Sequence, residues 1–298
     1  MKCVVVTGAA GFAGSNLTEE LVRQGYFVYG VVRPNSEHNK RLRNLDAVRL
    51  IELDLSELGR LMQFIQEPCD TFFHLAWVGE RDDFSKQFEN VTYALQAVEM
   101  AAKLGCKRFV CAGSQAEYGR QETLTTEDIL PKPVNAYGAS KVAALYLSKR
   151  RAEQLAMDWI WGRIFSLYGP YEPSGRMLPD LIKALGTLGH FKMSAATQSW
   201  DYLYARDAAK ALVLLMEKGR SGEIYNIANG EVRPLREFTE YIRETFFPEA
   251  SIEYAQESHW ETALWPSVEK ISQDTGWRAT TSFEEGMKLY RQKREKYV

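Results

Sequence analysis

The sequence has few cysteines and histidines, little net charge and no long apolar run. Its 298 residues include four cysteines and four histidines, and the cysteines show neither Cys-x-x-Cys spacing nor a nearby histidine cluster. This pattern predicts neither a metal site nor a disulfide. The formal net charge of −2 gives no reason to expect nucleic acid or a membrane surface as a partner. No apolar run approaches the roughly 20 residues that span a bilayer, and the first residues lack signal-peptide features, so we expect a cytoplasmic protein.

A glycine loop follows the first apolar segment of the chain. Residues 2–7 have the composition of a buried parallel strand, and residues 15–24 have the pattern of a helix. Between them, Gly8 allows a tight turn, Gly11 lets the backbone approach a phosphate, and Gly14 lets the helix pack on the strand. Because a helix N-terminus offers unpaired N–H groups, this segment predicts a site for a dinucleotide pyrophosphate.

The first half of the chain alternates between strand and helix patterns. This alternation indicates an α/β fold with a parallel sheet covered on both faces, whose ligands bind at the carboxyl ends of the strands. The pattern loosens after Pro170, and helices are expected near 178–188, 234–246 and 283–296. The strands are expected at 2–7, 26–32, 48–53, 70–76, 108–113 and 158–164, and the earlier helices at 15–24, 57–66, 84–104 and 137–156.

Three polar residues downstream suit proton transfer to a carbonyl or from an alcohol. Ser114 ends a predicted strand, and Tyr137 and Lys141 share one face of a predicted helix. A free tyrosine exchanges its proton only near pH ~10, and a neighbouring ammonium favours the phenolate. We therefore predict Tyr137 as general acid/base, Lys141 as the residue that tunes it, and Ser114 as a hydrogen-bond partner of the reacting oxygen. His74, inside an apolar run, is interpreted as structural.

These motifs together resemble the extended short-chain dehydrogenase/reductases, the group of sugar-nucleotide epimerases, dehydratases and ketoreductases. The Gly-x-x-Gly-x-x-Gly spacing and the trio carry the resemblance, with ordered matches at 54–56, 74–76, 90, 163–170, 201–204 and 222–227. It implies an enzyme with a doubly wound parallel sheet (a Rossmann fold) and a smaller C-terminal substrate-binding lobe. The nucleotide domain is expected at 1–169 and 200–230, and the lobe at 170–199 and 231–298. A homodimer is also expected.

The resemblance also implies roles for individual residues. Asp54 would accept a hydrogen bond from the adenine amino group, Lys141 would also bind the nicotinamide ribose, and Asn90 would be structural or order water near Lys141. The expected cofactor-binding residues are Gly8, Gly11, Phe12, Ala13, Gly14, Arg33, Asp54, Leu55, Leu75, Ala76, Tyr137 and Lys141. The expected substrate-binding residues are Trp77, Ser114, Gln115, Arg163, Ser166, Arg176 and Trp200.

The cofactor type depends on the end of the second strand. A site specific for NAD usually places an acid there, about 20 residues past the glycines, to bind the ribose 2′-hydroxyl. No acid lies between Arg23 and Ser36, and Arg33 stands at that position. Because a guanidinium pairs well with a phosphate, NADP is the preferred prediction and NAD the alternative. A surface arginine without a cofactor role also fits this position.

Departures from the family pattern narrow the activity. The 4,6-dehydratases follow the catalytic hydroxyl with Asp-Glu, whereas Gln115 and Ala116 follow Ser114 here, which argues against dehydration. Sugar-nucleotide members commonly carry an arginine where this chain has Trp200, and a second arginine has no clear counterpart around residues 258–261. Arg163, Arg176, Arg206 or Arg233 are candidates to bind a substrate diphosphate instead.

Three functions remain open from the sequence. The first is an NADP-dependent ketoreductase acting on a nucleotide-linked keto-deoxysugar. The second is a sugar-nucleotide epimerase that keeps NAD tightly bound. The third is a protein that senses NADP without turnover, which the presence of both Tyr137 and Lys141 disfavours. The sugar, the carbon and the stereochemistry are not determined.

Overall fold

A parallel sheet forms the centre of the computed structural model, which describes residues 2–257 and 263–295. Within these residues, seven strands pair in the order β11-β6-β5-β4-β1-β2-β3, and all six pairings are parallel. The chain turns from one half of the sheet to the other between β1 and β4, and such a switch point is where doubly wound sheets bind ligands. The strands are β1 (Cys3–Thr7), β2 (Phe27–Val32), β3 (Val48–Glu52), β4 (Thr71–His74), β5 (Arg108–Ser114), β6 (Asp158–Ile164) and β11 (Glu223–Ile227).

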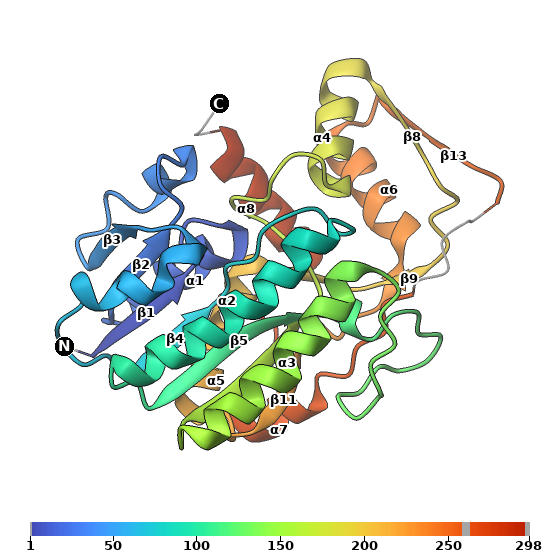
Figure 1. Ribbon diagram of the computed structural model, residues 1–298. Helices are drawn as coiled ribbons and strands as arrows, with labels where there is room; N and C mark the ends of the chain where they lie inside the picture. The colour runs from blue at the N-terminus through green and yellow to red at the C-terminus, as the bar shows by residue number, and fades with distance from the viewer. Residues whose placement is uncertain (1, 258–262, 296–298) are drawn as a thin grey trace.

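Helices cover both faces of this sheet, as a run of buried parallel strands requires. One face packs against α2 (Phe84–Lys103), α3 (Ala136–Gln154) and the 3-10 helix η2 (Leu55–Gln63). The other packs against α1 (Phe12–Arg23), α5 (Ala205–Lys218) and α7 (Glu269–Thr275). Figure 1 shows α2 and α3 side by side in front of the sheet. The doubly wound α/β prediction is therefore confirmed.

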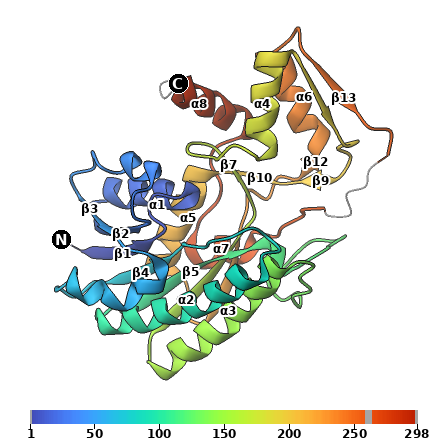
Figure 2. The ribbon, with the colours of Figure 1, turned by 45° about the horizontal axis from the view of Figure 1, so that its top comes forward.

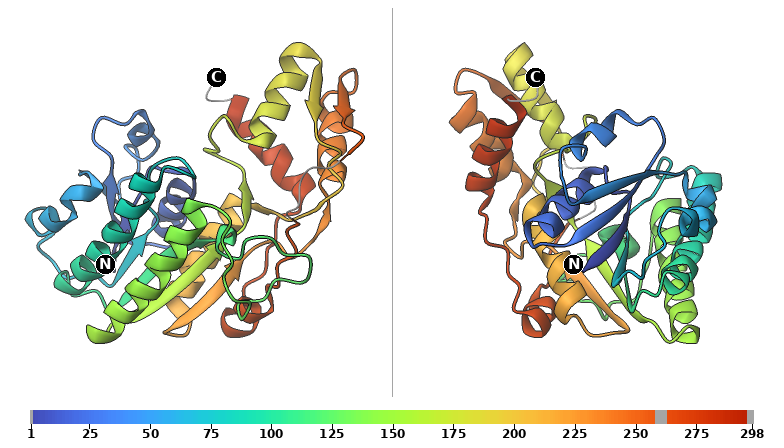
Figure 3. Two further views of the ribbon diagram at one scale, coloured as in Figure 1. Left: turned by 45° about the vertical axis from the view of Figure 1, so that its right-hand side comes forward. Right: turned by 90° about the vertical axis from the view of Figure 1, so that its left-hand side faces the viewer.

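A smaller lobe stands beside the sheet, joined to it by crossing segments (Figures 2 and 3). Its core is aromatic, with Tyr168, Tyr202, Phe238 and Phe283 in mutual ring contact. Since these rings come from segments far apart in the sequence, their burial holds the lobe together. The elements around them are α4 (Met177–Leu188), β8 (His190–Met193), α6 (Leu235–Phe246), β13 (Ser251–Tyr254) and α8 (Phe283–Glu295), with the short strands β7 (Ser166–Tyr168), β9 (Ser199–Trp200), β10 (Tyr202–Tyr204) and β12 (Arg233–Pro234).

Most element boundaries agree with the sequence patterns to within three residues, but two differences matter. The helix predicted at 57–66 is the 3-10 helix η2, which Asp54 caps at its start. The segment 231–298 was predicted to lie wholly in the lobe, whereas α7 packs against α5 and β11 of the large domain. The cause is the apolar side of α7, because Ile271 and the following Trp277 are buried in the same apolar cluster as residues of α5.

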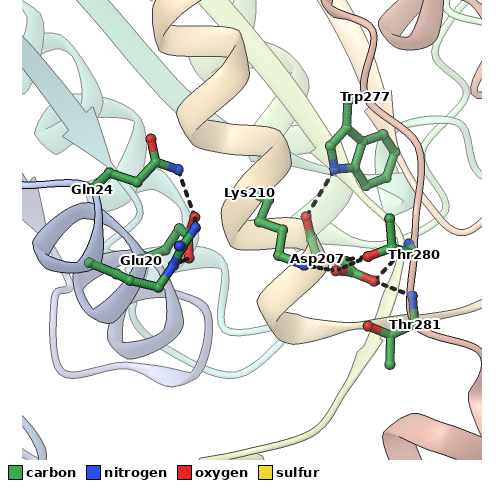
Figure 4. A network of polar contacts seen from close by, with 8 residues as sticks. Glu20, Gln24, Asp207, Lys210, Trp277, Thr280 and Thr281 are labelled. Atoms are coloured by element: carbon green, nitrogen blue, oxygen red, sulfur yellow. Dashed lines mark hydrogen bonds and ion pairs between the residues drawn. The ribbon is translucent and has the colours of Figure 1, made fainter.

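A buried carboxylate fastens the chain where it leaves α7 for the lobe (Figure 4). Asp207, near the start of α5, accepts hydrogen bonds from the backbone N–H groups of Thr280 (3.0 Å) and Thr281 (2.8 Å) and from Lys210 Nζ (2.8 Å). Trp277 Nε1 donates to the Asp207 carbonyl at 3.2 Å. Burial alone would raise the pKa of Asp207, but the hydrogen bonds from Lys210 and Thr281 lower it. The carboxylate thus sets the path of the chain into α8.

Two further features bear on the predicted absences. No helix in residues 2–257 and 263–295 is both long and apolar enough to cross a membrane. Among the same residues, no group of histidine, cysteine and acidic side chains is arranged to hold a metal ion, and the four cysteines are free thiols. Residues 258–261, where the sequence shows no counterpart of the second arginine of sugar-nucleotide members, lie outside the described residues.

Replacing Asp207 should destabilise the fold measurably. Asp207→Ala leaves the N–H groups of Thr280 and Thr281 without their acceptor, which should lower the free energy of unfolding by about 2–4 kcal/mol. Asp207→Asn keeps one carbonyl acceptor and should lose less. Urea unfolding of the three proteins measures this, and equal stability of wild type and Asp207→Ala would contradict the assigned role.

Candidate active site

The glycine loop is shaped by close backbone contacts between β1, α1 and the loop after β4. Gly8 has a φ of +70°, and a Cβ at this position would lie 2.8 Å from the backbone nitrogen of Ala76. A Cβ on Gly14 would lie 2.0 Å from the Gly8 carbonyl oxygen. Both positions therefore require glycine. The first turn of α1 carries no acidic residue, so its N-terminal partial positive charge is not neutralised locally.

A cleft of about 380 Å³ opens beside this loop, at the carboxyl ends of β1 and β2. Of the predicted cofactor residues, those that line it are Gly8, Gly11, Phe12, Arg33, Asp54, Leu55, Leu75 and Ala76, while Ala13, Gly14, Tyr137 and Lys141 do not. Trp77 and Arg176, which were predicted to bind substrate, also line it. The sequence patterns did not indicate Ala10, Val31, Val32, Ser36, His38, Asn39, Leu53 and Val78.

The end of β2 brings basic and polar groups to this cleft. Arg33 is exposed there, and the side-chain amide of buried Asn39 donates to the Arg33 carbonyl at 3.1 Å. Partial loss of solvation lowers the pKa of His38, and the nearby charges of Arg41 and Arg33 lower it further. The carboxylate of Glu52 accepts a bond from the Asn35 N–H but does not line the cleft. The local field at this end therefore favours an anion.

Asp54 presents an ionised carboxylate to the same cleft. Its Oδ1 accepts from the Ser56 N–H at 3.0 Å and from the Ser56 hydroxyl at 2.7 Å. These two bonds lower the pKa of Asp54. Asp54 and Ser56 of the Asp-Leu-Ser segment thus have a local role, since their hydrogen bonds cap the start of η2. The contact of Asp54 with adenine stays a prediction.

The predicted catalytic residues gather at the carboxyl end of β5. Ser114 ends this strand, and its Oγ accepts from the Ala116 N–H at 3.2 Å. Tyr137 and Lys141 lie in the first two turns of α3, which Asn135 caps through the N–H of Gly138 (2.8 Å). Lys141 is only 3% exposed, and its Nζ donates to the carbonyl of Ala112 at 2.7 Å, two residues before Ser114. The strand and the helix thus hold the lysine ammonium against the backbone of β5, close in sequence to Ser114.

Trp77 covers this ammonium. The Lys141 Nζ lies 3.5 Å from the centre of the indole, and the Tyr137 ring meets the same indole edge-on with centroids 6.0 Å apart. The indole is fixed in turn, because its Nε1 donates to buried Gln87 at 2.7 Å. A cation held over a tryptophan face is stabilised by about 0.5–2 kcal/mol. The predicted substrate contact of Trp77 remains a prediction, but the structure adds a role in positioning Lys141.

Asn90 and His74 support the loop that carries Trp77. Asn90 exchanges two hydrogen bonds with the backbone of Val78, at 3.0 and 2.8 Å, which fits the structural role expected for it. His74 is buried and shares a 2.8 Å hydrogen bond between its Nδ1 and the Thr7 hydroxyl. Burial, aided by the Lys141 charge, lowers the pKa of His74 to about 3. His74 therefore stays neutral and structural, as its apolar sequence context predicted.

The structure corrects the prediction for Arg163. Its guanidinium is 1% exposed and pairs with Glu117, with Nε 2.7 Å from Oε2. Glu117 also accepts from the Ser114 N–H at 2.7 Å and from Trp161 Nε1 at 2.9 Å. A buried arginine committed to a carboxylate is not available to a substrate diphosphate. The Ser-Gln-Ala-Glu segment forms a capping box, in which the glutamate side chain binds the backbone N–H of the serine. This local sequence pattern could have predicted the bond between Glu117 and Ser114.

The other predicted substrate residues lie on three short elements. Gln115 begins the 3-10 helix η3 (Gln115–Glu117) directly after Ser114. Ser166 begins β7 and Trp200 ends β9, and both are half-buried. The Trp200 ring lies 6.2 Å from Tyr202, at the edge of the aromatic core. Their contacts with substrate stay predictions.

A parallel sheet with a glycine loop and a cleft at its switch point, and a tyrosine–lysine pair in the helix α3 beside β5, are typical of NAD(P)-dependent enzymes. The chain belongs to the NAD dependent epimerase/dehydratase family, whose model matches residues 4–228. The chain is similar to the dTDP-D-glucose 4,6-dehydratase of Mus musculus, with 27% identity covering 96% of this chain and 87% of that protein. It is also similar to the UDP-glucose 4-epimerase of Corynebacterium glutamicum, with 28% identity covering 92% of this chain and 90% of that one.

The fold is that of solved structures as well. One is MoeE5 in complex with UDP-glucuronic acid and NAD, which has 26% identity, a TM-score of 0.84 and coverage of 99% of both chains. This likeness extends over the small lobe, which lies mostly beyond the residues that the family model matches. The predicted family and enzyme class are therefore confirmed.

The neutral state of His74 should appear as a pH-dependent stability. Its folded pKa of about 3 lies below the unfolded value of ~6.5, so the stability is present above pH ~6.5 and is lost as pH falls toward 3. Between pH 7 and pH 5 wild type should lose about 2 kcal/mol that His74→Gln does not lose. Urea unfolding of both proteins tests this. The difference in the free energy of unfolding between the two proteins should not change from pH 7.5 to 8.5. If this difference also stayed constant down to pH 5, the neutral state assigned to His74 would be contradicted.

Proposed function

We propose that this protein is an NAD(P)-dependent epimerase of a nucleotide-linked sugar, which oxidises one hydroxyl carbon transiently and reduces it again from the other face. The observation that supports the proposal is the set of contacts of Trp77, which lines the cleft and meets both Lys141 and Tyr137, while Lys141 donates to Ala112 near the end of β5. The 4-epimerase among the curated relatives, and the complex of MoeE5 with UDP-glucuronic acid and NAD, support this activity over simple ketoreduction.

The site fits a nicotinamide dinucleotide. Gly8 and Gly14 form a cradle that a Cβ would fill, and the Oδ1 of buried Asn39, beside the cleft, has no hydrogen-bond partner among the described residues. When bound, such a cofactor supplies a hydride acceptor. The residues that would hold it are the glycine loop, Asp54 and Lys141.

Tyr137 would take the proton of the sugar hydroxyl as the carbon loses its hydride, and would return the proton when the keto group is reduced. Ser114 would hold the oxygen in line. The buried ammonium of Lys141, held by the Ala112 carbonyl and covered by Trp77, would be the cation beside this acid/base, with its Nζ 5.8 Å from the centre of the Tyr137 ring. Holding these groups before the substrate arrives avoids reorganisation during the reaction.

The residues after Ser114 argue against dehydration, although dehydratases are among the relatives. Eliminating water needs an acid and a base beside the keto-sugar. Gln115 and Ala116 provide neither, and the one acid in that turn, Glu117, is buried and bound to Arg163, Trp161 and the Ser114 backbone.

A second candidate is an NADP-dependent ketoreductase, and one observation favours it. The cleft presents Arg33 at the end of β2, where an acid would be needed to bind the ribose 2′-hydroxyl of NAD. NAD that stays bound through purification and is released only when the protein is denatured would support the epimerase. NADPH that exchanges freely would support the reductase.

Self-association through α2 and α3 would account for several exposed apolar side chains. Phe84 and Phe88 on α2 are 75% and 72% exposed, and Tyr146 and Leu147 on α3 are also exposed. Burying these side chains against a second copy would remove apolar surface from water. The predicted homodimer is proposed on this basis.

Tyr137→Phe should lower turnover about 10²–10⁴-fold, because it removes the general acid/base, and should leave cofactor affinity nearly unchanged. UDP-glucose, UDP-galactose and UDP-glucuronic acid serve as substrate probes, with product ratios followed by chromatography. Turnover within threefold of wild type would refute the assignment. If wild type itself interconverts none of these but reduces a keto-sugar nucleotide, the ketoreductase reading replaces the epimerase.

Arg33→Gln should weaken NADPH about tenfold and NADH hardly at all, because only NADPH carries a 2′-phosphate for the guanidinium. Fluorescence titration of both cofactors measures the effect. Arg43→Gln removes the same charge from a nearby exposed position outside the cleft and is the matched control. An equal loss for both cofactors, or a wild-type preference for NADH, would exclude the 2′-phosphate role.

A further inference from the structure

Arg176 belongs to the small lobe but lies at the cofactor cleft. It is the N-cap of α4, the first helix of the lobe, and it lines the same cleft as Gly8, Gly11 and Phe12. Its guanidinium carbon lies 5.5 Å from the centre of the Phe12 ring, and Phe12 is the first residue of α1. An arginine of the lobe therefore stands beside the helix N-terminus at which a pyrophosphate would sit.

The segment that leads to Arg176 is fixed to the large domain. The side-chain amide of Asn16, in α1, donates to the Pro170 carbonyl at 3.0 Å. Tyr171 adopts a φ of +71°, its hydroxyl donates to Glu19 of α1, and Arg41 lies over its ring at 4.9 Å. These contacts place Pro170 and Tyr171 against α1. The approach of Arg176 to the glycine loop is thus a built feature of the fold.

The charge pattern of the cleft shows what this arginine can meet. The first turn of α1 lacks an acid, and the helix N-terminus carries a partial positive charge. Arg33 follows β2 and suits a phosphate on the adenosine ribose, whereas Arg176 lies over the start of α1. Two cationic sites in one cleft match a ligand with phosphate groups at two places.

We infer that Arg176 binds the pyrophosphate of the dinucleotide cofactor, so that the small lobe completes the cofactor site. This inference rests on the proposed dinucleotide site and reassigns Arg176, which the sequence suggested for the diphosphate of the substrate. Because α4 begins at Arg176, an occupied pyrophosphate site would add a contact between the small lobe and the large domain.

Calorimetric titration with three probes distinguishes binding of the cofactor pyrophosphate by Arg176 from binding of a ribose phosphate or of the substrate diphosphate. ADP-ribose contains the pyrophosphate without the nicotinamide, 2′-AMP contains a ribose phosphate without the pyrophosphate, and UDP-glucose represents the substrate diphosphate. Arg176→Gln should weaken ADP-ribose about tenfold, as expected for a lost charged hydrogen bond, and should leave 2′-AMP within twofold. Arg176→Lys should retain part of the affinity. The weakening of ADP-ribose by salt should also be smaller in Arg176→Gln.

Lys183→Gln removes one positive charge from the exposed side of the same helix, outside the cleft, and should change none of the affinities. Unchanged ADP-ribose binding in Arg176→Gln would overturn the inference, and so would a loss confined to UDP-glucose, which would return Arg176 to the substrate. If wild type binds neither ADP-ribose nor NAD(P)H, the proposed function itself fails, which distinguishes the two failures.

Discussion

The contact between the Gly8 carbonyl and Gly14 is the constraint on which the site depends. It lets α1 begin directly above the end of β1, with its N-terminus toward the cleft, and it leaves no space for a single methyl group. The same turn brings Gly8 against Ala76, so the loop after β4 is set by it as well. That loop carries Trp77, which covers Lys141. The glycine loop and Lys141 are therefore linked by packing at adjacent strand ends.

Buried polar groups fix the elements around this centre. Glu117 and Arg163 hold the turn after Ser114, and Gln87 and Asn90 hold the loop of Trp77. A buried ion pair contributes little net stability compared with an apolar pair, but it specifies one arrangement, since breaking it leaves a charge without a partner. Here the pair also keeps Glu117, the acid in the turn after Ser114, in the interior and bound to Arg163 and the Ser114 N–H.

The small lobe depends on the large domain at two places of different chemistry. Asp207 fastens the chain before α8 through backbone N–H groups, and Pro170 and Tyr171 rest on α1. Between them the lobe has its own aromatic core. Arg176 belongs to this lobe and lines the cleft, where it would meet a pyrophosphate.

The sequence by itself determined the parallel sheet, the glycine loop and the trio, because each is written in local features: strand and helix periodicity, backbone conformations open to glycine, and spacing along one helix face. It did not determine which arginine reaches a ligand. Arg163 and Arg176 look alike in sequence, yet one meets Glu117 in the interior and the other meets Phe12 at the cleft. The contact of Trp77 with Lys141 and the packing of α7 on α5 were likewise decided by the tertiary structure, since they join segments that approach each other only when the sheet has formed.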